Sequence, residues 1–210
     1  MGTNRLTQAG ATPGDGNAAK PRPELITVGH STHPLDTFLE LLRGACIALV
    51  ADVRRFPASR RHPHFGGPAL AASLAQAGMG YEHLPELGGR RAPAPGSVND
   101  GWRVAAFRGY ADHLRTAEFA AGRDRLAGLA AARRTVIMCA EAQPWRCHRR
   151  LIADVFLLDG WRVLDLMAPG RLHEHVPPDF MREGEDGLPV YRAQGGEPLF
   201  ERGRDPRRPG

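Results

Sequence analysis

The chain has 210 residues, of which 42% are hydrophobic, a length and composition suited to one domain with a sizeable core. Its 28 Lys and Arg residues outnumber its 23 Asp and Glu residues, and every cation except Lys20 is an arginine. The net charge of +5 is compatible with an anionic small molecule or a nucleic acid as partner, and equally with the arginine bias of a GC-rich genome. No apolar stretch approaches the ~20 residues that a membrane span needs, so we expect no membrane attachment.

The N-terminal part of the chain predicts a leader followed by a strand, a helix and a second strand. Residues 1–23 are rich in Gly, Ala, Thr and Pro, and we expect them to be disordered because they carry too little apolar surface to offset the entropy of ordering. Residues 25–28 have strand character, and apolar residues recur at helical spacing over residues 34–43. Residues 47–53 form a continuous apolar run, which is typical of a strand buried on both faces.

The remaining chain continues the alternation of helices and strands. Periodicity predicts further helices over residues 69–77, 107–114, 119–133 and 144–158, and further strands over residues 81–84, 135–139 and 161–166. This alternation predicts an α/β fold, a single three-layer domain over residues 24–176 with a mostly parallel central sheet of about five strands. Residues 177–210 are rich in Pro, Gly and charged residues, and we expect a loosely packed or disordered tail.

The three cysteines are too few for a disulfide framework, which favours a reducing, cytoplasmic location. Cys46 lies in an apolar stretch and is expected to be buried as a small hydrophobe. Cys139 ends a predicted strand, whereas Cys147 falls in the first turn of a helix that begins at Pro144. A helix N-terminus with arginines nearby lowers a thiol pKa, but Cys147 also shares a face with Leu151, so packing in the core is the alternative.

Five motifs occur in a fixed order along the chain: Thr27-Val28-Gly29-His30-Ser31, Asp52-Val53-Arg54 with Pro57 and Ser59-Arg60 after it, Leu87-Gly88-Gly89, Cys139-Ala140-Glu141 and Cys147-His148-Arg149. Together they resemble the widespread bacterial family called domain of unknown function 488, over roughly residues 24–170. The resemblance implies a compact α/β domain whose cysteine region is a candidate active site. It implies no particular reaction or substrate.

The motif residues are expected to share one crevice. The carboxyl ends of parallel strands lie at one edge of the sheet, and ligands of α/β proteins bind there, beside helix N-termini. If the strands that carry the motifs are neighbours, their polar side chains meet. The expected lining is His30, Ser31, Asp52, Arg54, Cys139, Glu141, His148 and Arg149.

These residues predict a thiol-dependent enzyme that acts on an anionic, phosphorylated or nucleotide-like substrate. Cys139 or Cys147 would be the nucleophile, and Glu141, His148 or Asp52 would transfer protons. The candidates for binding the anionic group are His30, Ser31, Arg54, Arg60 and Arg149. Each role has a structural alternative: packing for the thiols, ion pairs for the carboxylates and a solvated loop for the arginines.

Two other functions remain open. Cys139, Cys147 and His148, with His30 as a fourth ligand, would suit a metal or redox site, but Cys-x7-Cys-His is not a recognised zinc pattern. We therefore assign no metal and leave the cofactor unknown. The basic loop after Asp52 would also suit a non-catalytic nucleic-acid-binding module. The substrate and the oligomeric state do not follow from the sequence.

Overall fold

The structure, a computed structural model, describes residues 22–58 and 61–193. Nearly all of the predicted leader, the candidate residue Arg60 and the last part of the predicted tail therefore lie outside the described residues.

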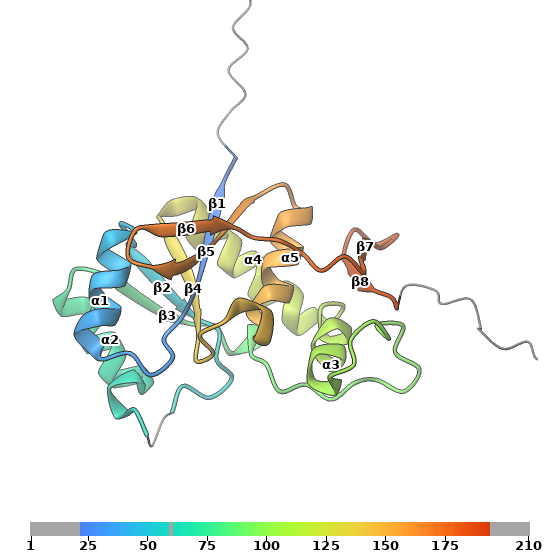
Figure 1. The fold of residues 1–210 in the computed structure, drawn as a ribbon, viewed down its shortest axis with the longest axis horizontal. Coiled ribbons are helices and arrows are strands. Elements are labelled where there is room, and N and C mark those ends of the chain that lie inside the picture. Colours follow the sequence, from blue (N-terminus) through green and yellow to red (C-terminus); the bar gives the residue numbers. More distant parts are fainter. Residues whose placement is uncertain (1–21, 59–60, 194–210) are drawn as a thin grey trace, which may run out of the picture.

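A six-stranded sheet forms the centre of the domain, in the order β3-β2-β4-β1-β5-β6 (Figure 1). The strands are β1 (Glu24–Gly29), β2 (Leu49–Asp52), β3 (Gly80–His83), β4 (Thr135–Cys139), β5 (Arg162–Ala168) and β6 (Arg171–Glu174). The first five pair in parallel, and β6 pairs antiparallel with β5. This confirms the predicted, mostly parallel sheet. The pattern missed β6 because its four residues include a single apolar side chain, Leu172.

Within the described residues, five α-helices and three short 3-10 turns connect the strands. The helices are α1 (Leu35–Gly44), α2 (Gly67–Gln76), α3 (Ala105–His113), α4 (Ala117–Ala132) and α5 (Arg149–Leu158), and the turns are η1 (Pro63–Phe65), η2 (Pro85–Leu87) and η3 (Pro144–Arg146). The start of α4 shows the local chemistry that sets a boundary. The Thr116 hydroxyl accepts a hydrogen bond of 3.1 Å from the Phe119 amide, which caps the first turn.

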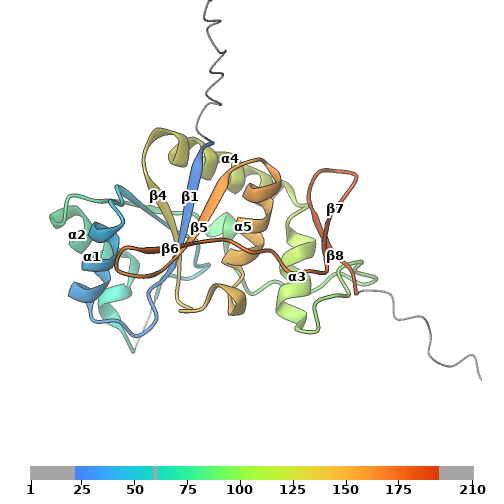
Figure 2. The same ribbon diagram turned by 45° about the horizontal axis from the view of Figure 1, so that its top comes forward.

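The helices form a layer on each face of the sheet. α1 and α2 cover one face, and α4 and α5 cover the other (Figures 1 and 2). Successive residues of β2 show why the strand is apolar throughout. Val50 belongs to a core cluster with Phe38 and Leu70 of the first layer, whereas Ala51 belongs to a second cluster with Leu126 of α4. The predicted three-layer α/β domain is therefore confirmed.

The strand order brings the motif-bearing segments together. β4 lies between β1 and β2, so the carboxyl ends of all three strands meet at one edge. Gly29 pairs with Cys139, and Asp52 pairs with Met138. Beyond β1 the pairing continues, because the His30 amide donates to the Cys139 carbonyl at 2.9 Å.

The continuous helix predicted for residues 144–158 is wrong. A short turn, η3, is followed by Cys147 in an extended conformation (φ −129°, ψ 145°), and α5 begins only at Arg149. The apolar spacing runs on across the break, so the sequence pattern does not reveal it. At the break, Nε2 of His148 lies 3.0 Å from the Val53 carbonyl beyond β2, a contact between residues far apart in the sequence.

Residues 177–193 are packed on the domain, contrary to the loosely packed tail that we expected after residue 176. They form a hairpin of β7 (Met181–Glu183) and β8 (Pro189–Tyr191). Tyr191 is fully buried, and its hydroxyl donates to Asp154 of α5 at 2.7 Å. A single aromatic anchor has no periodicity, so the composition of the segment concealed it.

Cys46 also differs from expectation. It is exposed, in the left-handed conformation (φ 54°) at the turn between α1 and β2. The turn geometry directs its side chain outward, although its neighbours in the sequence are apolar. Cys46 is therefore a free surface thiol.

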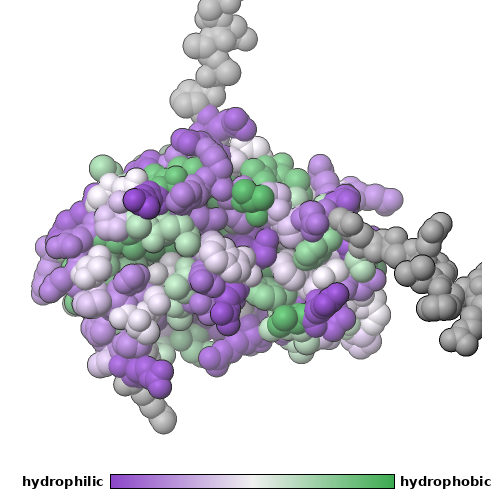
Figure 3. Space-filling model, in the orientation of Figure 1, coloured by the Kyte–Doolittle hydropathy of each residue, from purple (hydrophilic) through white to green (hydrophobic). Residues whose placement is uncertain are grey.

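No helix in the described part of the chain is both long enough and apolar enough to cross a membrane. The face of the domain shown in Figure 3 is mostly hydrophilic, with small apolar patches scattered over it.

Candidate active site

A cavity opens at the carboxyl edge of the sheet. It has a volume of about 240 Å³ and continues into a shallower outer hollow. Four of the expected residues line the cavity, namely His30, Arg54, Cys139 and His148. Three more line the outer hollow, namely Ser31, Glu141 and Cys147. The described structure therefore gathers seven predicted residues around one crevice.

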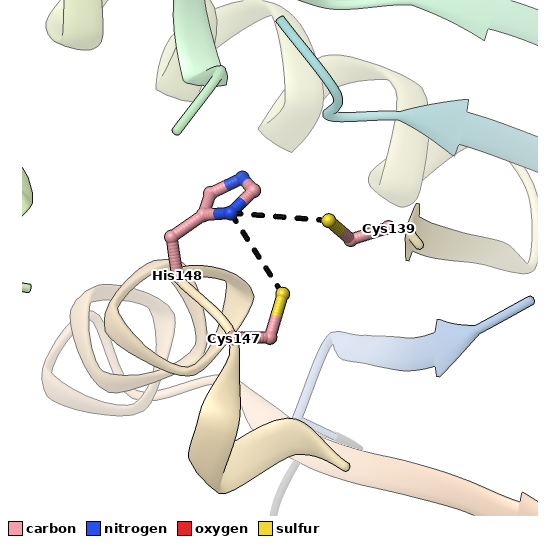
Figure 4. Close-up of side chains that lie close together, drawn as sticks. All are labelled: Cys139, Cys147 and His148. Atoms are coloured by element: carbon pink, nitrogen blue, oxygen red, sulfur yellow. Dashed lines mark hydrogen bonds between the residues drawn. The ribbon is translucent and has the colours of Figure 1, made fainter. Parts of the chain in front are cut away.

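Cys139, Cys147 and His148 meet at the floor of this crevice. Nδ1 of His148 lies 3.9 Å from the Cys139 sulfur and 3.7 Å from the Cys147 sulfur (Figure 4). Cys139 projects from the end of β4, whereas the other two side chains come from the segment that leads into α5 (Figure 4). Both cysteines are free thiols, and both are buried.

The imidazole of His148 is held in one tautomer. Its Nε2 lies 3.0 Å from the Val53 carbonyl, which can only accept, so Nε2 carries the proton. Nδ1 then presents its lone pair to the two sulfurs. The ring of Tyr110 packs against the imidazole with a centroid separation of 4.9 Å. On another side Gly89 lies so close that a Cβ there would be 2.8 Å from Nδ1. The orientation of the imidazole is thus fixed by its surroundings.

The two thiols differ in acidity. Burial raises the pKa of Cys147, but a hydrogen bond from the Cys139 thiol and the charge of Arg149 lower it to about 7. The hydrogen bond to Cys147, together with burial, raises the pKa of Cys139 to about 12. Because the two pKa values move in opposite directions, we expect Cys147 to ionise first while Cys139 keeps its proton.

Asp52 anchors Arg54 and does not face the cavity. Asp52 is fully buried, and its carboxylate accepts hydrogen bonds from the Arg54 guanidinium at 2.8 and 2.5 Å and from the Tyr81 hydroxyl at 2.8 Å. Its oxygens are already occupied, which favours the structural alternative over a role as general base. Arg54 lines the cavity, but its charge is paired with that of Asp52.

His30 is a buried, neutral side chain at the cavity wall. Its Nδ1 donates to the Ser31 carbonyl at 2.9 Å, and its Nε2 accepts from Arg54 at 3.2 Å. The imidazole stacks on Phe65 with a centroid separation of 4.1 Å. Burial and the nearby Arg54 charge lower the pKa of His30 to about 4, so it carries no charge at neutral pH. Ser31 adopts the left-handed conformation (φ 48°) that turns the chain into the hollow.

Arg149, like Asp52, is absent from the lining of the cavity and of the outer hollow. It is 1% exposed and donates to the backbone carbonyls of Glu141 and Ala142 and to the Thr27 hydroxyl. These contacts are all internal. The structure therefore does not support the predicted role of Arg149 in binding an anion. Arg149 instead holds the loop between β4 and η3 against β1. The Glu141 side chain is exposed on that loop.

Sequence reasoning missed several residues at the crevice. Arg55, Gly89 and Arg90 line the cavity. The close packing of Gly89 against His148 gives the Leu87-Gly88-Gly89 motif a structural role. Four exposed arginines surround the crevice without an ion pair among the described residues, namely Arg55, Arg61, Arg90 and Arg146. In this described lining, Glu141 is the single acidic residue, so the mouth is electropositive.

The fold and the site together define a three-layer α/β domain with a Cys–Cys–His cluster at the carboxyl edge of a parallel sheet. The chain belongs to the family described as "Domain of unknown function DUF488", whose model matches residues 34–156. The matched segment includes the cysteine cluster and the Asp52–Arg54 pair, whereas His30 and Ser31 precede it. Comparisons with curated proteins and with solved structures gave no match.

Proposed function

We propose that the protein is a thiol-dependent enzyme acting on an anionic, phosphorylated or nucleotide-like substrate, with Cys147 as nucleophile. The observation that carries this proposal is the Nδ1 lone pair of His148 facing two sulfurs in a crevice lined by cations. A thiol beside an imidazole that is itself oriented by a third group is the arrangement of nucleophilic cysteine catalysis. The Val53 carbonyl is the orienting group in this chain.

The proposed chemistry divides the two thiols between two roles. Cys147 attacks the electrophilic centre of the substrate, because the Cys139 thiol and the charge of Arg149 stabilise its thiolate. A new bond forms to sulfur as the bond to the leaving group breaks. His148 takes the Cys147 proton at Nδ1 as the thiolate forms and then gives it to the leaving group, while Cys139 keeps its own proton. Glu141, on the rim of the hollow, is the candidate for activating water in the release step.

The proposed substrate class follows from the charge of the mouth. Arg90 and Arg55 line the cavity, and Arg61 and Arg146 line the outer hollow. Guanidinium groups bind phosphates and carboxylates through paired hydrogen bonds. Because the Arg54 charge is already paired with Asp52, we assign substrate binding mainly to these exposed arginines.

A specific observation favours nucleic-acid binding as a second candidate. Phe56 is 65% exposed at the cavity mouth, with the Arg55 guanidinium 5.7 Å from its ring centroid. An exposed aromatic ring among arginines can stack on a base while the arginines contact phosphates. A polymer that neutralises several cations loses affinity steeply as salt rises, whereas a small anion loses far less. Binding of a fluorescent oligonucleotide at 50 and 200 mM salt therefore separates the two candidates.

The proposed function is tested by alkylating the thiols at a series of pH values in a Cys46→Ser background, which removes the exposed thiol. We expect the alkylation rate to rise with pH, with a midpoint near pH 7. The Cys147→Ser variant should react no faster than an inert protein. Phosphate or a nucleotide should lower the rate of the parent chain. In Cys139→Ala the Cys147 thiolate loses its hydrogen-bond donor, so the midpoint should shift upward. Thiols that stay inert up to pH 9 in the folded protein would exclude the enzyme.

A further inference from the structure

We infer that Cys139, Cys147 and His148 form a binding site for a soft divalent metal ion, with Zn²⁺ as the reference ion. The site would supply three protein ligands and leave the fourth position open to the crevice. Coordination itself does not depend on the proposed enzyme. The consequence, that bound metal masks the nucleophile, rests on the proposed function.

The first support is the geometry of the three ligand atoms. All three lie within 4.8 Å of one another, and Nδ1 is 3.7 and 3.9 Å from the sulfurs. Tetrahedral Zn²⁺, with bonds of about 2.3 Å to sulfur and about 2.0–2.1 Å to nitrogen, requires nitrogen–sulfur separations of roughly 3.6 Å. Shifts of a few tenths of an ångström would therefore bring both nitrogen–sulfur distances to this value.

The second support is the state of the ligands. The proton on Nε2 of His148 is held by the Val53 carbonyl, so Nδ1 is already the free donor atom. A backbone carbonyl on the other ring nitrogen is the usual second contact of a metal-binding histidine. Tyr110 and Gly89 pack against the imidazole and hold its plane in place. The histidine is thus pre-oriented toward the sulfurs.

The third support is charge. The cysteines are only 8% and 4% exposed, and two bare thiolates in such a place would repel each other and lose hydration. A divalent cation neutralises both, and thiolates select Zn²⁺ over hard ions such as Mg²⁺.

The fourth position distinguishes this site from a closed structural one. The described residues place three ligand groups in the cluster. His30, the fourth ligand considered from the sequence, instead accepts a hydrogen bond from Arg54 through Nε2. Three protein ligands with an open position leave room for water or an anion. In this chain that position lies beside the cationic cavity lined by Arg90.

The inference is tested on the reduced full chain carrying Cys46→Ser, titrated with Co²⁺ and then with Zn²⁺. We expect one Co²⁺ per chain, with the charge-transfer absorption of thiolate ligands and the visible band of a tetrahedral site, both abolished by one equivalent of Zn²⁺. Cys139→Ser, Cys147→Ser and His148→Gln should each lose this spectrum, whereas the exposed-site variant His173→Asn should keep it. A spectrum without thiolate bands, or metal retained by both serine variants, would overturn the site.

A measurement on the parent Cys46→Ser chain covers the case in which a ligand variant fails to fold. Alkylation with and without Zn²⁺, mapped by mass spectrometry, should show Cys139 and Cys147 protected together by about one equivalent of metal. Thiols that react equally with and without Zn²⁺ would refute the site while leaving the enzyme standing. Protection by Zn²⁺ in a protein whose metal-free thiols react only slowly at every pH would refute the enzyme while leaving the site standing.

Discussion

At His148 a single hydrogen bond decides what the imidazole can do. Donation from Nε2 to the Val53 carbonyl leaves Nδ1 as an acceptor, so the ring can take a proton from a thiol or bind a metal. The same bond joins the residue that precedes α5 to the segment after β2, and these are far apart in the sequence. The identity of the residue supplies the chemistry, and the fold supplies the tautomer.

Gly89→Ala should reduce thiol reactivity without unfolding the protein. The new Cβ would lie 2.8 Å from Nδ1 of His148, so the ring must move away from the sulfurs. We expect the alkylation rate of Cys147 and the affinity for Co²⁺ to fall by about 10- to 100-fold, the range seen when the surroundings of a metal ligand are disturbed.

The matched control is Gly128→Ala. Gly128 is exposed in α4, and a Cβ there meets nothing within 4 Å. This substitution should leave the thiols unchanged and stabilise the helix by up to about 1 kcal/mol. Equal reactivity of the two alanine variants would show that Gly89 does not position His148.

At the scale of elements, a buried charge cluster ties β6 and β8 to the core. His175, directly after β6, lies between Asp154 of α5 and Asp165 of β5 at 2.8 and 3.2 Å. Tyr191 of β8 donates to the second oxygen of Asp154. Burial lowers the pKa of His175, but the hydrogen bonds and charges of the two aspartates outweigh it and raise the pKa to about 9.

His175→Asn should therefore destabilise the protein in a pH-dependent manner. Because the pKa is raised from 6.5 in the unfolded chain to about 9 in the fold, the contribution of His175 is complete below pH 6.5 and is lost as the pH rises through 9. Urea unfolding should show a deficit of about 3 kcal/mol at pH 6 that shrinks by pH 10. His173→Asn, an exposed histidine two residues away, should show little deficit at either pH. A deficit that is the same at both pH values would contradict the protonated cluster.

At the scale of the whole molecule, the C-terminal segment completes the second core cluster. The ring of Trp102 packs against Phe180 and Tyr191 at centroid separations of 4.9 and 5.3 Å, and all three belong to or pack on the cluster that contains α4 and α5. The hairpin also contacts the backbone of the long loop before α3, because the Gly101 amide donates a hydrogen bond of 3.0 Å to the Tyr191 carbonyl.

A chain ending at residue 176 should accordingly be much less stable than a chain ending at residue 193. Removal of a fully buried tyrosine and its aromatic neighbour costs about 3–5 kcal/mol by analogy with large-to-small core substitutions. For a domain of this size that corresponds to a thermal midpoint lower by roughly 10 °C or more, measurable by circular dichroism. Equal midpoints for the two truncated chains would show that residues 177–193 are dispensable, as the composition had suggested.

The sequence by itself determined the alternating α/β order, the buried character of the strands and the segments that carry the chemistry. Those features depend on periodicity and on residue type, which are local. Only the tertiary structure decided that the Arg149 and Tyr191 side chains are buried and that Asp52 forms an ion pair with Arg54. It also decided that the predicted helix is interrupted before α5. Arg149, His148 and Tyr191 each find a partner that is distant in the chain. Asp52 and Arg54 are only two residues apart, but the sequence does not show that these two buried groups pair with each other.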